Sequence, residues 1–206
     1  MYTTETTTIK ERYDRFARFY DLSQFLVEKG LFHKIRRATL GDLEGRVLEI
    51  GVGTGMNLRY YNPNAELTAI DISQKMLEKA KERAGNLGLH VDFRLMDAQD
   101  LEFEDSSFDY VIGTFVLCSI PDPVKALKEI RRVVKEGGKI VFIEHVLSKY
   151  WPIALFEHSH NFINRYLFGF NVNRDTRQNI IKSGICITSD ENLYFFDVLR
   201  RFTCSK

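Results

Sequence analysis

The residues best suited to chemistry lie in two short segments, 47–55 and 67–71. Residues 47–55 read Val-Leu-Glu-Ile-Gly-Val-Gly-Thr-Gly, an apolar strand that leads into a glycine-rich turn. Because glycine has no Cβ, Gly51, Gly53 and Gly55 let a ligand approach the backbone closely. The next apolar run ends at Asp71, twenty residues after Gly51. An acidic side chain at that place can accept two hydrogen bonds from a ribose diol, so the two segments together predict a nucleoside-containing ligand.

The spacing of the glycines separates two classes of cofactor. Nicotinamide cofactors are bound by Gly-x-Gly-x-x-Gly, but here Met56 occupies the last position of that pattern. The observed Gly-x-Gly-x-Gly, after a strand that ends in Glu49, resembles the first motif of the class I S-adenosylmethionine (SAM) methyltransferases. The resemblance implies SAM as the cofactor and S-adenosylhomocysteine as its product. It also implies that Glu49 helps to hold the amino group of SAM, through the loop or through water.

Strand and helix patterns alternate along the chain, which predicts an α/β fold with a parallel sheet between two layers of helices. The expected strands are 46–51, 66–71, 90–95, 108–115 and 139–146, and the expected helices are 5–20, 22–40, 55–61, 73–84, 123–135 and 175–183. The resemblance implies a doubly wound, Rossmann-like sheet of seven strands in the order 3-2-1-4-5-7-6, with strand 7 antiparallel and residues 185–203 as the closing hairpin.

Length and composition restrict the class of protein. The 206 residues, 44% of them hydrophobic, suit one globular domain with a full core. The resemblance implies that residues 1–206 form a single SAM-dependent methyltransferase domain. A net charge of +1 does not indicate a nucleic-acid partner. Cys118, Cys186 and Cys204 lack the paired spacing of a disulfide framework or a zinc site. No apolar run approaches the roughly 18 residues of a transmembrane helix. We therefore predict a cytoplasmic protein without a metal, with peripheral membrane contact as an alternative and an oligomeric state that the sequence does not determine.

Further cofactor contacts are expected where the strands end. The resemblance implies that the Asp97 side chain and the backbone N–H of Ala98 recognise the adenine edge. Ile72 and Met76 could enclose the adenine ring or belong to the core. Thr114 ends the fourth strand, and the resemblance implies that the backbone there borders the methionine part of SAM.

The N-terminal residues 1–40 are expected to form a helical lid. The tract from Tyr13-Asp14 to Tyr20-Asp21 is similar to the N-terminal lid of quinone and lipid methyltransferases. This similarity adds Tyr20 to the predicted cofactor contacts.

The acceptor is less well determined. Residues 115–120, 143–146 and 171–176 resemble segments of methyltransferases that act on small thiols. Chains of similar size methylate quinone precursors or phospholipid headgroups. The acceptor is therefore expected to be small or lipophilic, with thiol S-methylation first, quinone C-methylation second and phospholipid N-methylation third.

Two residues are candidates for catalysis. His145 follows the fifth strand and titrates near neutral pH, so it could act as a base or be a structural histidine beside the site. Arg174 could hold an anionic group or favour a thiolate, or it could form a surface salt bridge. Asp175 is expected to cap a helix, and Cys118 to belong to the core or the pocket wall, because methyl transfer from SAM is usually direct.

Residues 150–172 form an aromatic insertion that is expected to cover the acceptor pocket. The same stretch could instead lie on a membrane interface, although it has few basic residues. His158 and His160 are two positions apart and point in different directions on a helix, so they form a poor metal pair.

Other classes of function are compatible with parts of the sequence. A SAM-binding sensor or scaffold would keep the same cofactor loop. A nucleic-acid methyltransferase is disfavoured by the near-neutral charge and by Leu117-Cys118-Ser119-Ile120, where an Asn/Asp-Pro-Pro-Tyr motif would stand. A dehydrogenase is disfavoured by the glycine spacing.

Overall fold

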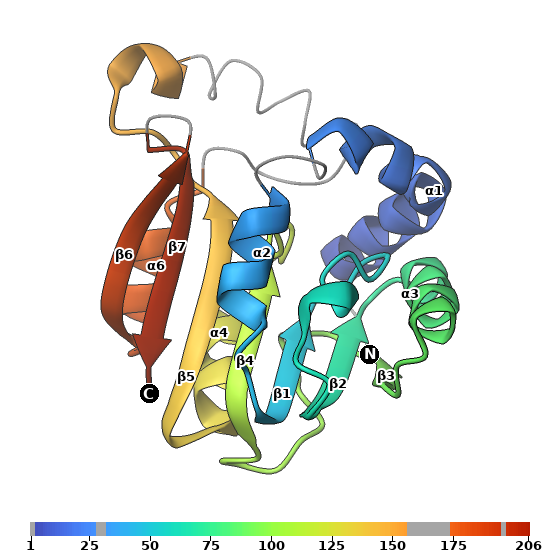
Figure 1. Cartoon of the computed structure of the whole chain (residues 1–206). Coiled ribbons are helices and arrows are strands. Elements are labelled where there is room, and N and C mark those ends of the chain that lie inside the picture. Colours follow the sequence, from blue (N-terminus) through green and yellow to red (C-terminus); the bar gives the residue numbers. More distant parts are fainter. Residues whose placement is uncertain (1–2, 28–31, 156–173, 195–196) are drawn as a thin grey trace.

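The structure is a central sheet with helices on both faces (Figure 1). It is a computed structural model, which describes residues 3–27, 32–155, 174–194 and 197–206. The strands are β1 (Gly45–Ile50), β2 (Ala65–Asp71), β3 (Asp92–Leu95), β4 (Phe108–Thr114), β5 (Val134–His145), β6 (Cys186–Tyr194) and β7 (Leu199–Ser205). Their order is β3-β2-β1-β4-β5-β7-β6. β1 to β5 are parallel, and β7 is antiparallel to both β5 and β6. The predicted fold and strand order are confirmed.

The helices agree with the sequence patterns in most places. They are α1 (Thr4–Val27), α2 (His33–Leu40), α3 (Gln74–Leu87), α4 (Pro123–Val133) and α6 (Thr176–Lys182), with a short 3-10 helix η2 (Leu58–Tyr60). Residues 151–155 are also helical. None of the described helices combines the length and the hydropathy that a membrane-spanning segment requires.

Three predictions of local structure were wrong. The break expected between helices 5–20 and 22–40 is absent, because α1 continues to Val27 and α2 begins only at His33. The helix expected at 55–61 is a series of turns with η2, because Gly55 has a left-handed backbone (φ +80°) that an α-helix cannot contain. The helix expected to reach residue 135 ends at Val133, and β5 begins at once with Val134. Gly137 and Gly138 therefore lie inside a long strand, next to an irregularity in its pairing with β4.

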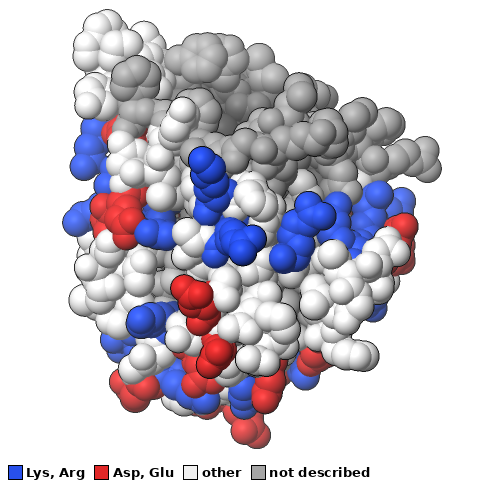
Figure 2. Space-filling model, in the orientation of Figure 1, with Lys and Arg blue, Asp and Glu red and all other residues white. Residues whose placement is uncertain are grey.

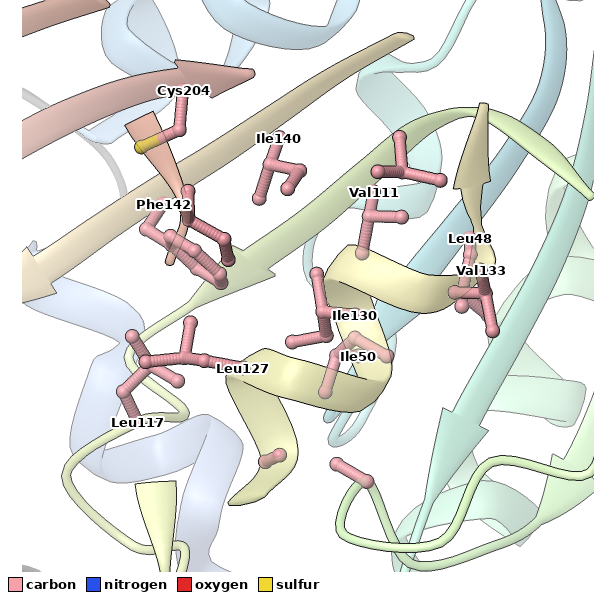
Figure 3. Packing of buried hydrophobic residues seen from close by; sticks show 14 of the residues in the cluster. Leu48, Ile50, Val111, Leu117, Leu127, Ile130, Val133, Ile140, Phe142 and Cys204 are labelled. Atoms are coloured by element: carbon pink, nitrogen blue, oxygen red, sulfur yellow. The ribbon is translucent and has the colours of Figure 1, made fainter. Parts of the chain in front are cut away.

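The core has two main parts, one on each face of the sheet. On one face, α4 inserts Leu127, Ile130 and Val133 between side chains of β1, β4 and β5 (Figure 3). On the other face, Leu40 of α2 and Leu77 and Ala80 of α3 pack on the same strands. Since the central strands are covered on both sides, they read as nearly continuous apolar runs.

N-cap hydrogen bonds at the first turns of three helices hold the loops that precede these helices. The Ser73 hydroxyl accepts a hydrogen bond from Met76 N (3.2 Å), so Ser73 is the N-cap of α3. Asp122 caps α4 by accepting from Lys125 N (2.9 Å). Asp175 caps α6 by accepting from Gln178 N (2.9 Å).

Tight packing of β4 predicts opposite effects for two glycine substitutions. Gly113→Ala is expected to destabilise the protein by about 1–3 kcal/mol, because its Cβ would lie 2.9 Å from Cδ1 of the buried Phe142 ring. Gly85 in α3 is the matched control, since no atom lies within 4 Å of its Cβ position. Gly85→Ala should stabilise by about 0.5–1 kcal/mol through helix propensity. Chemical denaturation measures both, and equal effects would contradict this description of the core.

Candidate active site

A hollow lies where the carboxyl ends of β1, β2 and β4 meet, which is where open α/β sheets bind ligands. Of the residues predicted from the sequence, its lining includes Gly51, Gly53, Asp71, Ile72, Met76, Asp97, Ala98 and Thr114. The other predicted residues are not in that lining. They are Glu49, Gly55, His145 and Arg174. The fold therefore brings together side chains from four separate segments of the sequence.

The three glycines have different roles in the turn after β1. All three have left-handed backbones, with φ of +66°, +56° and +80° for Gly51, Gly53 and Gly55. A Cβ on Gly53 would meet no atom within 4 Å, so this residue faces open space in the hollow. A Cβ on Gly51 would come within 2.4 Å of Val116 Cγ2, and one on Gly55 within 2.6 Å of Leu58 Cδ1. Gly53 thus leaves room for a ligand, whereas Gly51 and Gly55 permit close packing.

Asp71 is held by backbone groups on two sides. Its Oδ2 accepts a hydrogen bond from Gly53 N (2.8 Å), and its Oδ1 accepts one from Ser73 N (2.8 Å). Burial raises the pKa of Asp71 to about 6, against the lowering effect of these hydrogen bonds. The carboxylate is fixed at the rim of the hollow, and it can still accept from a diol through its remaining lone pairs.

The end of the hollow near β3 is built around Asp97. Both of its carboxylate oxygens accept from the Gln99 amide (3.1 and 3.0 Å), and Oδ1 also accepts from Gln99 N (2.9 Å). Gln99 in turn accepts from Asp122 N (3.0 Å). Met76 is almost completely buried and Ile72 is half-buried, and both line the hollow. This end has the apolar walls and the single acidic side chain that suit a purine.

A buried polar cluster lies behind the glycine turn. Glu49 Oε1 accepts from Asn57 Nδ2 (2.7 Å), and Asn57 Nδ2 also donates to Thr114 Oγ1 (3.1 Å). Arg36 of α2 donates to Asn57 Oδ1 and to Thr114 Oγ1 (3.4 Å). Burial raises the pKa of Glu49 to about 7, opposed first by the Asn57 hydrogen bond. Glu49 is thus linked through Asn57 to Thr114, which lines the hollow, and Arg36 bonds to the same two residues; the sequence analysis missed both Asn57 and Arg36.

Helix α1 lies across the hollow. Thr6, Ile9 and Tyr13 line it, and the Tyr13 and Ser119 hydroxyls are 2.5 Å apart. Asp14 Oδ1 accepts from Ser73 Oγ (2.5 Å) and from Lys75 N (3.2 Å). These contacts place α1 against both sides of the opening. The backbone of Tyr20 belongs to α1, but its side chain lies outside the residues that the structure describes.

The wall after β4 depends on Glu144. This fully buried side chain of β5 accepts from Val116 N (2.9 Å) and Leu117 N (3.1 Å). Phe115, which precedes them and lines the hollow, has a left-handed backbone (φ +54°), an unfavourable state for a bulky residue. Burial raises the pKa of Glu144 to about 8. Glu144 holds a strained segment of the pocket wall in place.

Arg174 and Cys118 belong to the outer side of the same wall. Arg174 donates to the carbonyl oxygens of Leu117 (2.9 Å) and Ile120 (2.5 Å). Cys118 is buried, and burial together with the nearby Glu144 raises the pKa of its thiol to about 12. A protonated thiol is a poor nucleophile, which agrees with the prediction that Cys118 is part of the core or wall.

His145 ends β5, opposite Leu199 of β7. Because neighbouring residues on a strand face opposite sides, His145 lies on the sheet face opposite Glu144. Ile143 shares the face of His145 and packs with Phe32 and Phe115.

Only residues 150–155 of the predicted aromatic insertion are described, and His158 and His160 lie outside the described residues. Within the described part of the chain, no group of three or more histidine, cysteine, aspartate or glutamate side chains is arranged to hold a metal ion. Asp109 is bound to Lys135 Nζ (2.7 Å) and Arg46 N (2.9 Å) at the start of β4, far from the carboxyl ends of the strands.

Comparisons with known proteins agree with this geometry. A family model described as a methyltransferase domain matches residues 48–142. The phosphatidylethanolamine N-methyltransferase of Cereibacter sphaeroides is 35% identical over 158 residues, which cover 74% of this chain and 75% of the relative. The chain belongs to the class I SAM-dependent methyltransferases. It is therefore an enzyme that uses SAM.

Other relatives differ in their acceptors. Human thiol S-methyltransferase TMT1B is 36% identical over 128 residues, covering 60% of this chain and 52% of the relative. A demethylmenaquinone methyltransferase of Staphylococcus aureus is 36% identical over 145 residues, which cover 66% of this chain and 56% of the relative. A SAM-dependent methyltransferase structure from Thermotoga maritima has a TM-score of 0.71 at 21% identity and covers 95% of this chain and 99% of that one. The last similarity supports the fold alone.

The residues of the hollow fit SAM. Open space at Gly53, the fixed carboxylate of Asp71 and the apolar walls near Asp97 match the backbone, diol and purine requirements of an adenosine-containing cofactor. SAM supplies an electrophilic methyl group on a sulfonium centre when it is bound.

Asp71 predicts a pH dependence of SAM binding. A ribose diol donates hydrogen bonds to the ionised form of Asp71, and the pKa of Asp71 without ligand is about 6. The dissociation constant of SAM should therefore rise as the pH falls below 6, by about tenfold per pH unit at the limit. Asp71→Asn should weaken binding and lose this part of the pH dependence. Isothermal titration calorimetry from pH 5 to 7.5 measures both. An unchanged pH profile in the variant would contradict the assigned role.

Glu144 predicts a contrast between two substitutions. Glu144→Leu should destabilise the protein by about 2–4 kcal/mol, because two buried N–H groups lose their acceptor. Glu144→Gln keeps an acceptor oxygen and should cost less than about 1 kcal/mol. Denaturation at a fixed pH checks this pair.

The sign of the pH effect follows from the raised pKa. The contribution of Glu144 to the free energy of unfolding is largest below its ordinary pKa of 4.5 and is lost as the pH rises to about 8. The difference between wild type and Glu144→Gln isolates this effect from Asp71 and Glu49. A difference that does not change over this range would be evidence against it.

Proposed function

We propose that this enzyme transfers the methyl group of SAM to the amine of an aminophospholipid headgroup. The observation that carries the proposal is the match to a phosphatidylethanolamine N-methyltransferase along about three quarters of both chains. The apolar side chains Phe115, Val116 and Ile120 on the wall of the hollow support a lipophilic acceptor.

A small thiol is the second candidate. The similarity to thiol S-methyltransferase TMT1B supports it, and so does the sequence Leu117-Cys118-Ser119 with Glu144-His145-Val146. The demethylmenaquinone relative supports a quinone precursor in the same way. The amine, the thiol and the quinone precursor are chemically distinct acceptors that lose a proton from different groups. A methylation assay with one acceptor of each class can therefore distinguish them.

We propose His145 as the group that removes the proton of the acceptor. An amine attacks the methyl group through its nitrogen lone pair, so a protonated amine has to lose a proton before a C–N bond can form. His145 lies at the carboxyl end of β5, on the same face of the sheet as the packing partners of Phe115. Arg174 is proposed as a positioning residue, since it binds the carbonyl oxygens of the wall. Helix α1 is proposed to act as the lid over the cofactor.

The experiment is a methylation assay with labelled SAM and four acceptors: phosphatidylethanolamine in detergent, an alkyl thiol, hydrogen sulfide and a demethylated quinol. Methylated lipid, together with an equal amount of S-adenosylhomocysteine, is the expected result. Turnover of a thiol or a quinol alone would replace the proposal with that acceptor. SAM binding without turnover of any acceptor would favour a sensor or scaffold.

Matched histidine variants test the proposed base. His145→Gln should lower kcat at least about tenfold, with SAM affinity unchanged. His90, which is exposed in the segment before β3, is the control, and His90→Gln should behave like wild type. A kcat of His145→Gln equal to that of wild type would remove His145 from the chemistry.

A further inference from the structure

Three large apolar side chains are exposed on one short stretch of the chain. Tyr150, Trp151 and Leu155, named here the apolar patch, are 57%, 76% and 62% exposed. Residues 150–155 read Tyr-Trp-Pro-Ile-Ala-Leu, without a charged residue, and residues 151–155 are helical. Single exposed apolar residues are common on proteins, but several large ones together indicate a contact surface.

A hollow with basic side chains adjoins the patch. It has a volume of about 270 Å³, and its lining includes Lys149, the residue directly before Tyr150. Its charged lining consists of Lys149, Arg174, Arg177 and Arg200 with Asp175, Asp190 and Asp197.

The acidic side chains of this hollow are engaged by the protein itself. Asp190 pairs with Arg200 (2.7 Å) and Arg177 (3.5 Å). Asp175 caps α6, and Asp197 accepts from Ser148 Oγ (2.6 Å) and Lys149 N (2.7 Å). The same ion pairs engage Arg177 and Arg200, and Arg174 binds the pocket wall. With four basic and three acidic side chains the lining has a net charge of +1, and Lys149, directly before the apolar patch, is the basic side chain placed to meet an anionic group.

The patch also lies at the edge of the molecule where the active site opens. In Figure 1, the helix of residues 151–155 lies beyond the carboxyl ends of the parallel strands, and the cofactor hollow is formed at the same ends of β1, β2 and β4. Figure 2 shows several lysine and arginine side chains in a band across the middle of this face, with acidic side chains beside the band and below it. An acceptor held in a surface placed against this edge would be delivered to the active site.

We propose that residues 149–155 dock on the surface of a phospholipid bilayer. Tyr and Trp prefer the boundary between headgroups and acyl chains, and Leu155 adds apolar area that enters the boundary with them. Lys149 and the basic hollow then face lipid phosphates. The inference rests on the proposed function insofar as the bilayer holds the acceptor, but docking itself requires neither SAM nor turnover.

The full chain offers a direct probe, because Trp151 is its one tryptophan. Vesicles of phosphatidylethanolamine and phosphatidylglycerol, added without SAM, should shift Trp151 emission to shorter wavelength, and lipids brominated on the acyl chain should quench it. Trp151→Ala should lower cosedimentation with these vesicles at least about tenfold. Lys149→Gln should lower binding at low salt and have less effect at high salt.

Leu87→Ala is the matched control, since Leu87 is 38% exposed at the C-terminal end of α3, the helix that returns from the carboxyl end of β2 to the other edge of the sheet. It should bind vesicles like wild type. Unchanged emission with vesicles, or equal cosedimentation of Trp151→Ala and wild type, would overturn the proposal. If the protein without vesicles shows an emission shift that grows with protein concentration and a molecular mass above that of one chain, the apolar patch would instead be assigned to contact with a second copy of the chain.

The two proposals can fail separately. Methylation of detergent-dispersed phosphatidylethanolamine without vesicle binding would reject docking and leave the function. Vesicle binding by an enzyme that methylates only a thiol would reject the lipid acceptor and leave docking.

Discussion

The site depends on carboxylates that bind backbone N–H groups of a neighbouring strand's loop. Asp71 at the end of β2 holds Gly53 in the loop after β1, and Glu144 near the end of β5 holds Val116 and Leu117 in the loop after β4. Both carboxylates are buried, and unpaired N–H groups at such places would be costly. The two interactions stand on either side of the cofactor hollow, so the shape of the hollow is set by bonds between adjacent strands rather than by single loops.

This arrangement explains why much of the lining of the hollow could be predicted from the sequence. The Gly51–Gly55 spacing and Asp71 are local patterns, and the parallel sheet brings them together once strand order is known. Asp97, Ala98 and Thr114 follow strand ends in the same way. A sequence pattern is informative here because each strand contributes its own carboxyl end to one edge.

Other parts required contacts that the sequence does not display. Arg36 and Asn57 meet Thr114 and Glu49 only because α2 and the turns after Gly55 cover one face of the sheet. Glu144 lies in an apolar strand run, and a buried acid among Val, Phe and Ile was the available signal for its importance. The end of α4 was predicted wrongly for a similar reason. Gly137 and Gly138 lie at an irregularity inside β5 and do not terminate a helix.

The left-handed backbone of Phe115 has a consequence for changing acceptor preference. Replacement at 115 is limited by backbone geometry, since few side chains tolerate that conformation. Val116 is limited by its close approach to Gly51. Ile120 lines the same hollow, and its interaction with Arg174 uses only its carbonyl oxygen. Ile120 is itself buried in the hydrophobic core. Of these three wall positions, residue 120 is therefore limited by side-chain packing rather than by backbone conformation or a neighbouring glycine, so a smaller apolar side chain there is the simplest change for a larger acceptor.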